Sequence, residues 1–291
     1  MANLKDLRNR IASVRATCKI TSAMKMVAAS KLRRAQTQAE NARPYAESLQ
    51  DMLASVSQGI PAHDDSLPAW ARASGNKSPA LVVLTSDRGL CGGFNASVVR
   101  DVRHRVDELE KQGTPPILIC IGRRGRDMLK RTHSKYIVHS MDFGRTPSYA
   151  VAQDLAETLV KLFTQSKLDS CDLMFNAFKN ALQQELRMRR IMPAPMDPPE
   201  EAAAKPTVWR IYEPGRNEIL AGLLPLNMKT QIYLAMVESM AGEHAARMTA
   251  MDSATRNASE MIDRLNLRYN RLRQAAITTE MIEIVSGSEA M

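Results

Sequence analysis

The sequence predicts an α/β fold combined with a long antiparallel α-helical coiled coil, formed by the two ends of the chain around an inserted domain of mostly parallel strands. Three observations predict it. Apolar residues recur at helical spacing at both ends of the 291-residue chain. Short apolar runs alternate with helical segments in the middle. Aromatic residues make up 4% of the chain against 44% hydrophobic residues, which is typical of long helices. We expect five parts: an N-terminal coiled-coil helix (1–58), a linker (59–79), a central α/β domain (80–193), a linker with an edge segment (194–225) and a C-terminal coiled-coil helix (226–291).

The N-terminal helix is predicted over residues 3–57. Residues spaced alternately by three and four form the first stretch of its apolar seam: Leu4, Leu7, Ile11, Val14 and Cys18. The pattern then favours a shift in register, to Ile20, Met24 and Val27, and resumes at Tyr45, Leu49, Met52 and Val56. Such spacing indicates a helix that packs lengthwise on another helix, with one interruption in phase. Pro44 lacks a backbone donor, so we expect a bend there.

The central domain is predicted to be Rossmann-like. Short, mainly apolar runs favour strands over residues 80–85, 116–121, 135–138 and 172–178. Helical segments fall between them, over residues 96–111, 124–130 and 149–165. This alternation predicts βαβ units and a mostly parallel sheet that is covered on both faces. A further edge strand is expected at residues 208–212, after a proline-rich linker.

The C-terminal helix has the more regular seam. Its positions alternate by three and four without a slip: Met248, Met251, Thr255, Ala258, Ile262, Leu265, Tyr269, Leu272 and Ala276. Because a helix of this length is not stable alone in water, it needs a partner along its seam. The simplest partner is the N-terminal helix, running antiparallel.

The charge of the chain is concentrated at its N-terminus. The formal net charge is +9, and residues 1–43 carry ten Lys and Arg residues against Asp6 and Glu40. Such a field attracts an acidic partner, whether nucleic acid, anionic lipid or an acidic protein surface. The cations occur all round the predicted helix without interleaved aromatic residues, which disfavours nucleic acid.

Catalytic and metal-binding patterns are not found in the sequence. The four cysteines show no C-x-x-C spacing and the five histidines no H-E-x-x-H, so we expect buried free thiols, no metal site and no cofactor. No nucleophile elbow is present, and we expect no catalytic residue. Nor do we find a secretory signal or an apolar run long enough to cross a bilayer.

One glycine-rich turn, residues 85–95, invites a phosphate-binding interpretation because it follows a strand and opens a helix. It matches neither G-x-G-x-x-G nor the P-loop pattern, and it lacks the P-loop lysine. We therefore favour a structural tight turn that the Asp87–Arg88 pair braces, and keep nucleotide binding as an alternative.

Taken together, these segments resemble the γ subunits of F-type ATP synthases, of the bacterial type. The residues that carry the resemblance are Ile11–Val14, Lys19–Thr21, Ala23–Met24, Met26–Lys31 and Arg43–Tyr45 at the start, Ser86–Asn95 in the turn, and Glu243–Met248, Met251, Ala254–Thr255, Asn257–Ala258, Arg273–Ala275, Ile277–Glu280 and Glu283–Gly287 near the end. They follow one another in order over almost the whole chain.

The resemblance implies a non-catalytic rotor shaft that couples proton-driven rotation of a membrane c ring to conformational cycling of catalytic β subunits. The implied partners are three α and three β subunits around the coiled coil, the ε subunit and the c ring. The implied location is the cytoplasmic side of the bacterial plasma membrane, as a peripheral protein held through the complex. The family's chloroplast members carry a regulatory cysteine pair late in the central domain, whereas residues 193–206 contain no cysteine, so thiol regulation is not expected.

The resemblance also implies contact residues. Four cations of the first helix are expected to meet an acidic segment of β, and three residues of the last helix to hydrogen-bond β loops: Lys25, Lys31, Arg33 and Arg34, then Arg247, Arg273 and Gln274. The small and apolar stretch after Glu283 is expected to turn inside the ring, where a strongly charged tip would be costly to desolvate. The alternatives to a shaft are a basic coiled-coil scaffold that binds nucleic acid and a nucleotide-binding enzyme that uses the glycine-rich turn.

Overall fold

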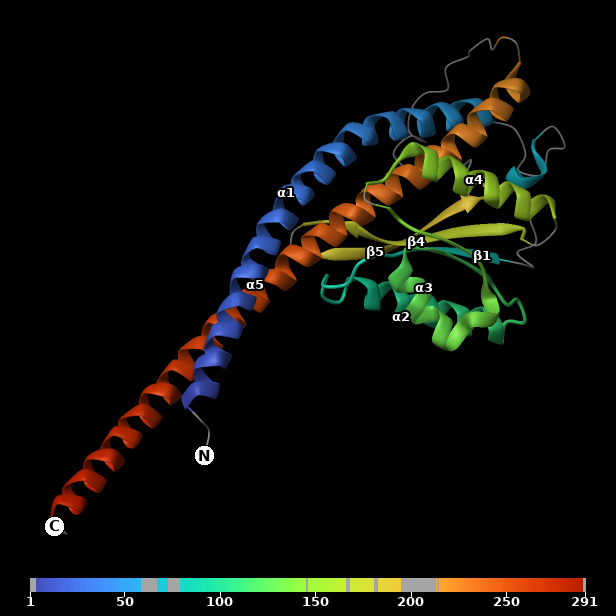
Figure 1. Ribbon diagram of the computed structural model, residues 1–291. Coiled ribbons are helices and arrows are strands. Elements are labelled where there is room, and N and C mark those ends of the chain that lie inside the picture. The colour runs from blue at the N-terminus through green and yellow to red at the C-terminus, as the bar shows by residue number, and fades with distance from the viewer. Residues whose placement is uncertain are drawn as a thin grey trace. The chain divides into compact units, whose positions relative to one another are not determined.

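A computed structural model of the chain describes residues 4–58, 67–72, 79–144, 146–165, 168–180, 183–194, 213 and 215–289. The chain divides into two compact units. We call residues 30–246 the body unit, and residues 1–29 with 247–291 the rod unit. Figure 1 shows the described elements, and each unit is described by itself below.

Five α-helices, five strands and two short 3-10 helices occur in the described residues. The helices are α1 (Leu4–Ser57), α2 (Phe94–Lys111), α3 (Arg123–His133), α4 (Tyr149–Thr164) and α5 (Arg216–Glu289), with 3-10 turns η1 (Ala69–Ala71) and η2 (Ser134–Tyr136). The strands are β1 (Pro79–Leu84), β2 (Ile117–Ile121), β3 (Ile137–Met141), β4 (Ser170–Phe178) and β5 (Gln184–Met192). The predicted alternation of strands and helices is confirmed.

The body unit is built on one five-stranded sheet of order β3-β2-β1-β4-β5. The β3–β2, β2–β1 and β1–β4 pairs are parallel, and only β4–β5 is antiparallel. Helices α2 and α3 cover one face, and α4 lies on the other (Figure 1). All six residues of β1 are buried, as expected for a strand covered on both faces. The mostly parallel sheet predicted from the sequence is confirmed.

Strand β5 was not predicted. Its sequence, QELRMRRIM, is too polar to read as a buried strand, and most of its residues are exposed or half-buried. It is held at the edge of the sheet by antiparallel pairing with β4, and Arg190 forms a two-pronged ion pair with the buried Asp172 of that strand. The edge strand that we expected at residues 208–212 lies outside the described residues.

The α1 seam differs from the prediction. Instead of shifting to Ile20 and Val27, which are 60% and 57% exposed, it keeps one phase. The buried positions that continue it are Thr21, Ala28, Leu32, Ala35, Ala39, Ala46, Leu49, Leu53 and Val56. All of them fall on a single heptad pattern that begins at Leu7. The predicted interruption was wrong because small Ala and Thr side chains, which carry little apolar signal, fill the seam there.

One helix boundary also differs from the prediction. Helix α1 runs through Pro44 as one helix, as predicted. We expected the last helix to begin at about Leu226, but α5 begins at Arg216 and includes Pro225. Leu220 and Leu224 in this extra stretch pack with Leu53 and Val56 of α1, so tertiary packing maintains the helix past a proline.

Candidate functional site

The rod unit is an antiparallel pair made by the first half of α1 and the second half of α5. Leu7 and Ile11 form one apolar cluster with Leu265. Further along, the Cys18 thiol contacts the Thr255 carbonyl at 3.9 Å, and the Thr255 hydroxyl lies 2.8 Å from that of Thr21. Because contacts advance on α1 as they recede on α5, the helices run in opposite directions. The predicted α5 seam is confirmed, since all its positions are buried or half-buried.

An ion pair occupies the next step of this seam. The Lys25 amine donates to Asp252 Oδ1 at 2.6 Å, and Arg256 donates to the same carboxylate. These cations hold the pKa of Asp252 below its usual range, chiefly through the hydrogen bond from Lys25. The sequence analysis missed Asp252. The available signal was that Lys25 falls on the α1 heptad, between Thr21 and Ala28, where a charged residue requires an opposite charge across the seam.

The last turns of α5 expose an apolar surface. Beyond Leu272 every residue with described burial is exposed except the half-buried Ala276. The large apolar side chains among them are Ile277, Met281, Ile282, Ile284 and Val285. Exposed apolar surface of this kind marks an interaction site in a soluble protein. The end of α5 is therefore built to be covered.

The seven candidate contact residues belong to different units. Lys31, Arg33 and Arg34 are exposed on α1 in the body unit. At ~100° of rotation per helical residue, Lys31 and Arg34 are neighbours about 60° apart, and Arg33 lies about 100° from Arg34.

The other four candidates lie in the rod unit. Lys25 is committed to Asp252, and Arg247 is partly buried. Arg273 and Gln274 are exposed on the unpaired end of α5, next to the apolar surface just described. These two are the candidates that the structure brings closest to a surface needing a cover.

The glycine-rich turn is closed by its own side chains. Asp87 accepts hydrogen bonds from the backbone N–H groups of Arg123, Phe143 and Gly144, at 2.9–3.1 Å. Those donors lie after β2 and β3, at the carboxyl edge of the parallel sheet where doubly wound folds bind phosphate. The Asp87 carboxylate thus takes the donors that an anion would need. Asp87 does brace the turn as expected, but through these backbone groups.

The rest of the turn is equally tight. Asn95 accepts from the Ser86 backbone N–H at 2.9 Å and donates to the Ser86 hydroxyl at 2.7 Å. Gly122 has a φ of 101°, and a Cβ there would lie 2.1 Å from the Thr85 carbonyl oxygen. The structural interpretation of the turn therefore accounts for the polar side chains of Ser86, Asp87 and Asn95, and for Gly92, whose φ is 56°.

The cysteines are free thiols, three of them buried and Cys18 half-buried. Burial raises the pKa of Cys120 to about 11 and raises that of Cys171 further. Both thiols are therefore protonated near neutral pH and are poor nucleophiles and metal ligands. Across the described residues no group of three or more His, Cys, Asp or Glu side chains could hold a metal ion. None of the described helices is long and apolar enough to span a membrane.

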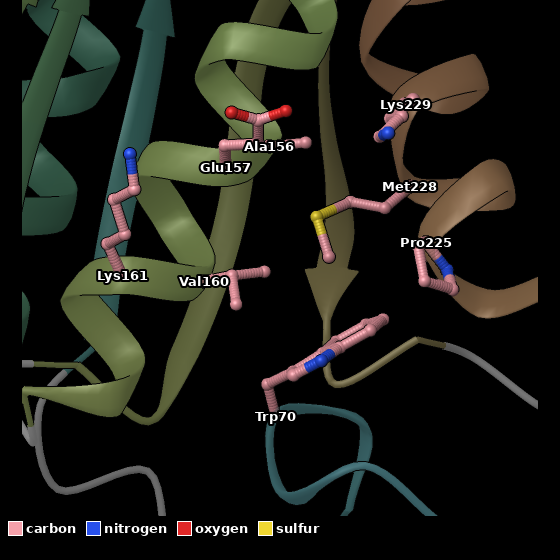
Figure 2. A pocket seen from close by; sticks show the side chains of 8 residues that line it. All are labelled: Trp70, Ala156, Glu157, Val160, Lys161, Pro225, Met228 and Lys229. Carbon is pink, nitrogen blue, oxygen red and sulfur yellow. The ribbon is translucent and has the colours of Figure 1, made fainter. Parts of the chain in front are cut away.

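A pocket of about 300 Å³ lies between α4, η1 and α5 in the body unit. Figure 2 shows Trp70, Val160 and Met228 facing its interior, while the Lys161 amine points away. The ionisable residues of its lining are Glu157, Lys161 and Lys229. Glu157 accepts a hydrogen bond from Gln153. The lining offers an apolar surface and no nucleophile paired with a base.

Comparison with known proteins agrees with this architecture. The family model described as ATP synthase matches residues 3–291. The ATP synthase gamma chains of Parvibaculum lavamentivorans and Paramagnetospirillum magneticum are 45% and 46% identical to this chain, each over the full length of both proteins. A chain in the central stalk and c-ring structure of the Tetrahymena thermophila mitochondrial ATP synthase is 28% identical, with a TM-score of 0.61, and covers 81% of this chain and 99% of its own length. A chain of the Euglena gracilis mitochondrial ATP synthase shares the fold, with a TM-score of 0.64 at 17% identity over 99% of this chain and 94% of its own.

Proposed function

The chain belongs to the ATP synthase gamma-chain family, and from that premise we propose that it is the central rotor shaft of a bacterial F-type ATP synthase. It couples proton-driven rotation of a membrane c ring to ATP synthesis, or ATP hydrolysis to proton pumping. Its partners are the α and β subunits around the coiled coil, the ε subunit and the c ring. The relatives from Tetrahymena and Euglena belong to assemblies whose descriptions name a c ring.

The observation that carries this proposal is the unpaired end of α5. In the rod unit, α1 covers α5 as far as Leu272, and the exposed apolar side chains follow immediately. Leaving such a surface in water is unfavourable, by ~25 cal/mol for each Å². A sleeve formed by a ring of partner subunits would cover this surface at every rotational position of the helix.

The shaft acts by differential contact. A partner changes a conformational equilibrium only if it binds the alternative states unequally. A helix pair in a ring of equivalent β subunits presents a different side to each of them, so each β subunit is biased towards a different state. Rotation then moves every β subunit through the same series of states.

We assign the contacts with the β subunits to the seven candidate residues. The cations Lys25, Lys31, Arg33 and Arg34 meet an acidic segment of β, with Lys25 acting together with its partner Asp252. Arg247, Arg273 and Gln274 hydrogen-bond β loops. Exposed cations give long-range attraction and orientation more than they give affinity, which suits a surface that must make and break contacts at every turn.

The chain itself is non-catalytic in this proposal, and ATP chemistry belongs to β. Asp87 occupies the donors at which the sheet domain would hold a phosphate. The complex holds the chain at the cytoplasmic face of the bacterial plasma membrane, as a peripheral protein. No described helix offers an alternative anchor.

The test is to purify the tagged full-length chain from detergent-extracted membranes of its host and to identify what accompanies it by mass spectrometry. The shaft requires the α, β, ε and c subunits to co-purify in a complex that hydrolyses ATP. Recovery with nucleic acid instead, or saturable nucleotide binding by the chain alone, would refute the shaft and favour the scaffold or the enzyme.

A further inference from the structure

One stretch of α5 in the body unit is tied to several other elements by polar contacts. Over Gln231–Gly242, about 16 Å of helix, α5 contacts α1, β4 and β5. The Tyr233 hydroxyl accepts a hydrogen bond from Gln38 of α1 at 2.7 Å. Gly242 packs so closely that a Cβ there would lie 3.1 Å from the Asn176 carbonyl oxygen of β4. This stretch lies just before Arg247, where the rod unit begins.

A buried carboxylate lies at the centre of this stretch. Glu238 has a side chain only 9% exposed, and it lies between two arginines that come from different elements. Its Oε1 is 3.8 Å from the guanidinium of Arg43 on α1, and its Oε2 is 4.0 Å from that of Arg189 on β5. Within the described chain, Oε2 is buried and accepts no hydrogen bond.

These distances are ion-pair distances and exceed the ~2.7–2.9 Å of a charge-assisted hydrogen bond. The carboxylate is therefore shared between both cations and is not committed to either. An exposed pair of this length would contribute little. Burial of Glu238 changes that, because removal of one partner leaves a buried charge uncompensated.

Arg189 is itself held in place from three sides. Its Nη1 donates to Gln231 Oε1 at 2.9 Å, and its guanidinium lies over the Phe175 ring at 5.5 Å. Burial lowers the pKa of Arg189 from its ordinary value, and the opposing charge of Glu238 counteracts this. Arg189 therefore presents a fixed positive charge from the sheet to α5.

We propose that Arg43, Glu238 and Arg189 form a joint that fixes the rotational setting of α5 against α1 and the sheet, so that torque passes between the body unit and the shaft. A group ~6 Å from a helix axis moves about 2 Å when the helix turns by about 20°, which is enough to break either contact. Glu238 and Arg189 are thus positioning residues. The inference rests on the proposed rotor function and adds the site at which torque enters α5.

The test uses the whole ATP synthase in inverted membrane vesicles. Two matched substitutions, Glu238→Gln and Arg189→Gln, remove one charge each. Their controls are Glu185→Gln and Arg187→Gln, which remove the same charges from an exposed ion pair on β5. ATP hydrolysis and ATP-driven proton pumping are measured on the same vesicles, and subunit content is checked on gels.

We expect Glu238→Gln and Arg189→Gln to lower the number of protons pumped per ATP hydrolysed by about threefold or more, in complexes of normal composition. The double variant should be no worse than either single variant, since all three remove one joint. The controls should pump at the wild-type ratio. A wild-type ratio in Glu238→Gln, or losses that multiply in the double variant, would overturn the inference.

If complexes that carry Glu238→Gln do not assemble, Arg189→Lys tests the joint in the same measurement. It retains the charge but loses the planar fork that contacts both Gln231 and Glu238, so the ratio should again fall, whereas an unchanged ratio would overturn the joint. Absence of the chain from vesicles that pump protons normally would refute the rotor function itself, which is a separate result.

Discussion

At the level of single residues, the Asp87 carboxylate occupies the place where folds of this class often bind a phosphate. Its carboxylate accepts from three backbone N–H groups on two loops, one of them the Arg123 N–H at the start of α3. The residue caps a helix and joins the loops after β2 and β3. It therefore replaces a ligand with a permanent structural contact.

Asp87→Ala should lower the free energy of unfolding of the full-length chain by about 2 kcal/mol, because the first N–H group of α3 and two loop N–H groups lose their charged acceptor together. Urea unfolding followed by circular dichroism measures this. The control is Asp142→Ala, which removes an exposed partner of Arg123 and should cost ~0.5 kcal/mol or less. Equal effects of the two substitutions would contradict the bracing role of Asp87.

The buried thiols give a second prediction. Since burial raises the pKa of Cys120 to about 11 from 9.0, its thiolate fraction at pH 8 is only ~10⁻³. In the native chain, a maleimide should label Cys18 well before Cys120 and Cys171, and in urea it should label all four cysteines. The raised pKa favours the folded state below pH 9, and this contribution is lost as the pH rises to about 11. Rapid labelling of Cys171 in the native chain would show that the sheet opens.

The exposed cations of α1 give a third prediction. Reversing both charges in Arg33→Glu with Arg34→Glu should weaken the coupling of ATP hydrolysis to proton pumping, because an acidic segment of β would be repelled. Pumping is measured in inverted vesicles. Lys130→Glu with Arg131→Glu, the same reversal on exposed residues of α3, should leave coupling intact. Unchanged pumping in the Arg33 and Arg34 variant would remove these residues from the contact surface.

At the level of elements, the coiled coil depends on which face of α5 packs against α1. In the rod unit, Leu265 is 9% exposed and packs on Leu7 and Ile11. Two residues further along α5, Leu267 is 62% exposed. The same residue type thus occurs on both faces of one helix turn, which provides a direct comparison of buried and exposed positions.

Leu265→Ala should destabilise the chain by about 2 kcal/mol, through lost burial and the cavity left behind. Leu267→Ala should change stability by less than about 0.5 kcal/mol. Limited proteolysis at the N-terminal end of α1 should report the same order, with faster cleavage in Leu265→Ala. If the two variants behaved alike, the pairing of α1 with α5 at this level would be wrong.

An element could be predicted from the sequence where its buried side chains are large and apolar. Strand β1 is buried throughout, and its apolar run predicted it well. Strand β5 could not be predicted in this way, since its position depends on pairing with β4 and on the Arg190–Asp172 contact. The α1 seam was misplaced because Ala28 and Ala35 are buried without standing out in the pattern, whereas Ile20 stands out and is exposed.

The contact surface was less accessible to sequence reasoning than the fold. The resemblance supplied Arg273 and Gln274, and the structure puts both on the uncovered end of α5. It could not supply the Lys25–Asp252 pair or the Glu238 joint, because these contacts join different elements: Lys25 and Asp252 are 227 positions apart, and Glu238 contacts α1 at Arg43 and β5 at Arg189. Such pairs become visible only when the elements are packed.

At the level of the whole molecule, the chain combines a sheet domain with a helix pair, and the last turns of α5 in that pair are apolar and unpaired. The sheet domain is stabilised by contacts among its own residues, including those of Asp87 in the glycine-rich turn. The helix pair exposes apolar side chains at the end of α5, and these need a partner to cover them. A rotor shaft requires both features: a rigid domain that receives torque, and an apolar end that turns inside a ring of subunits.

The most direct test is to watch the chain turn. In complexes fixed through their β subunits, a bead is attached to Lys130→Cys on the exposed face of α3, in a chain whose half-buried Cys18 is replaced by serine. Addition of ATP should drive rotation in one direction, with one step for each catalytic β subunit. A bead that stays still while the same complexes hydrolyse ATP at the normal rate would contradict the assignment of this chain as the shaft.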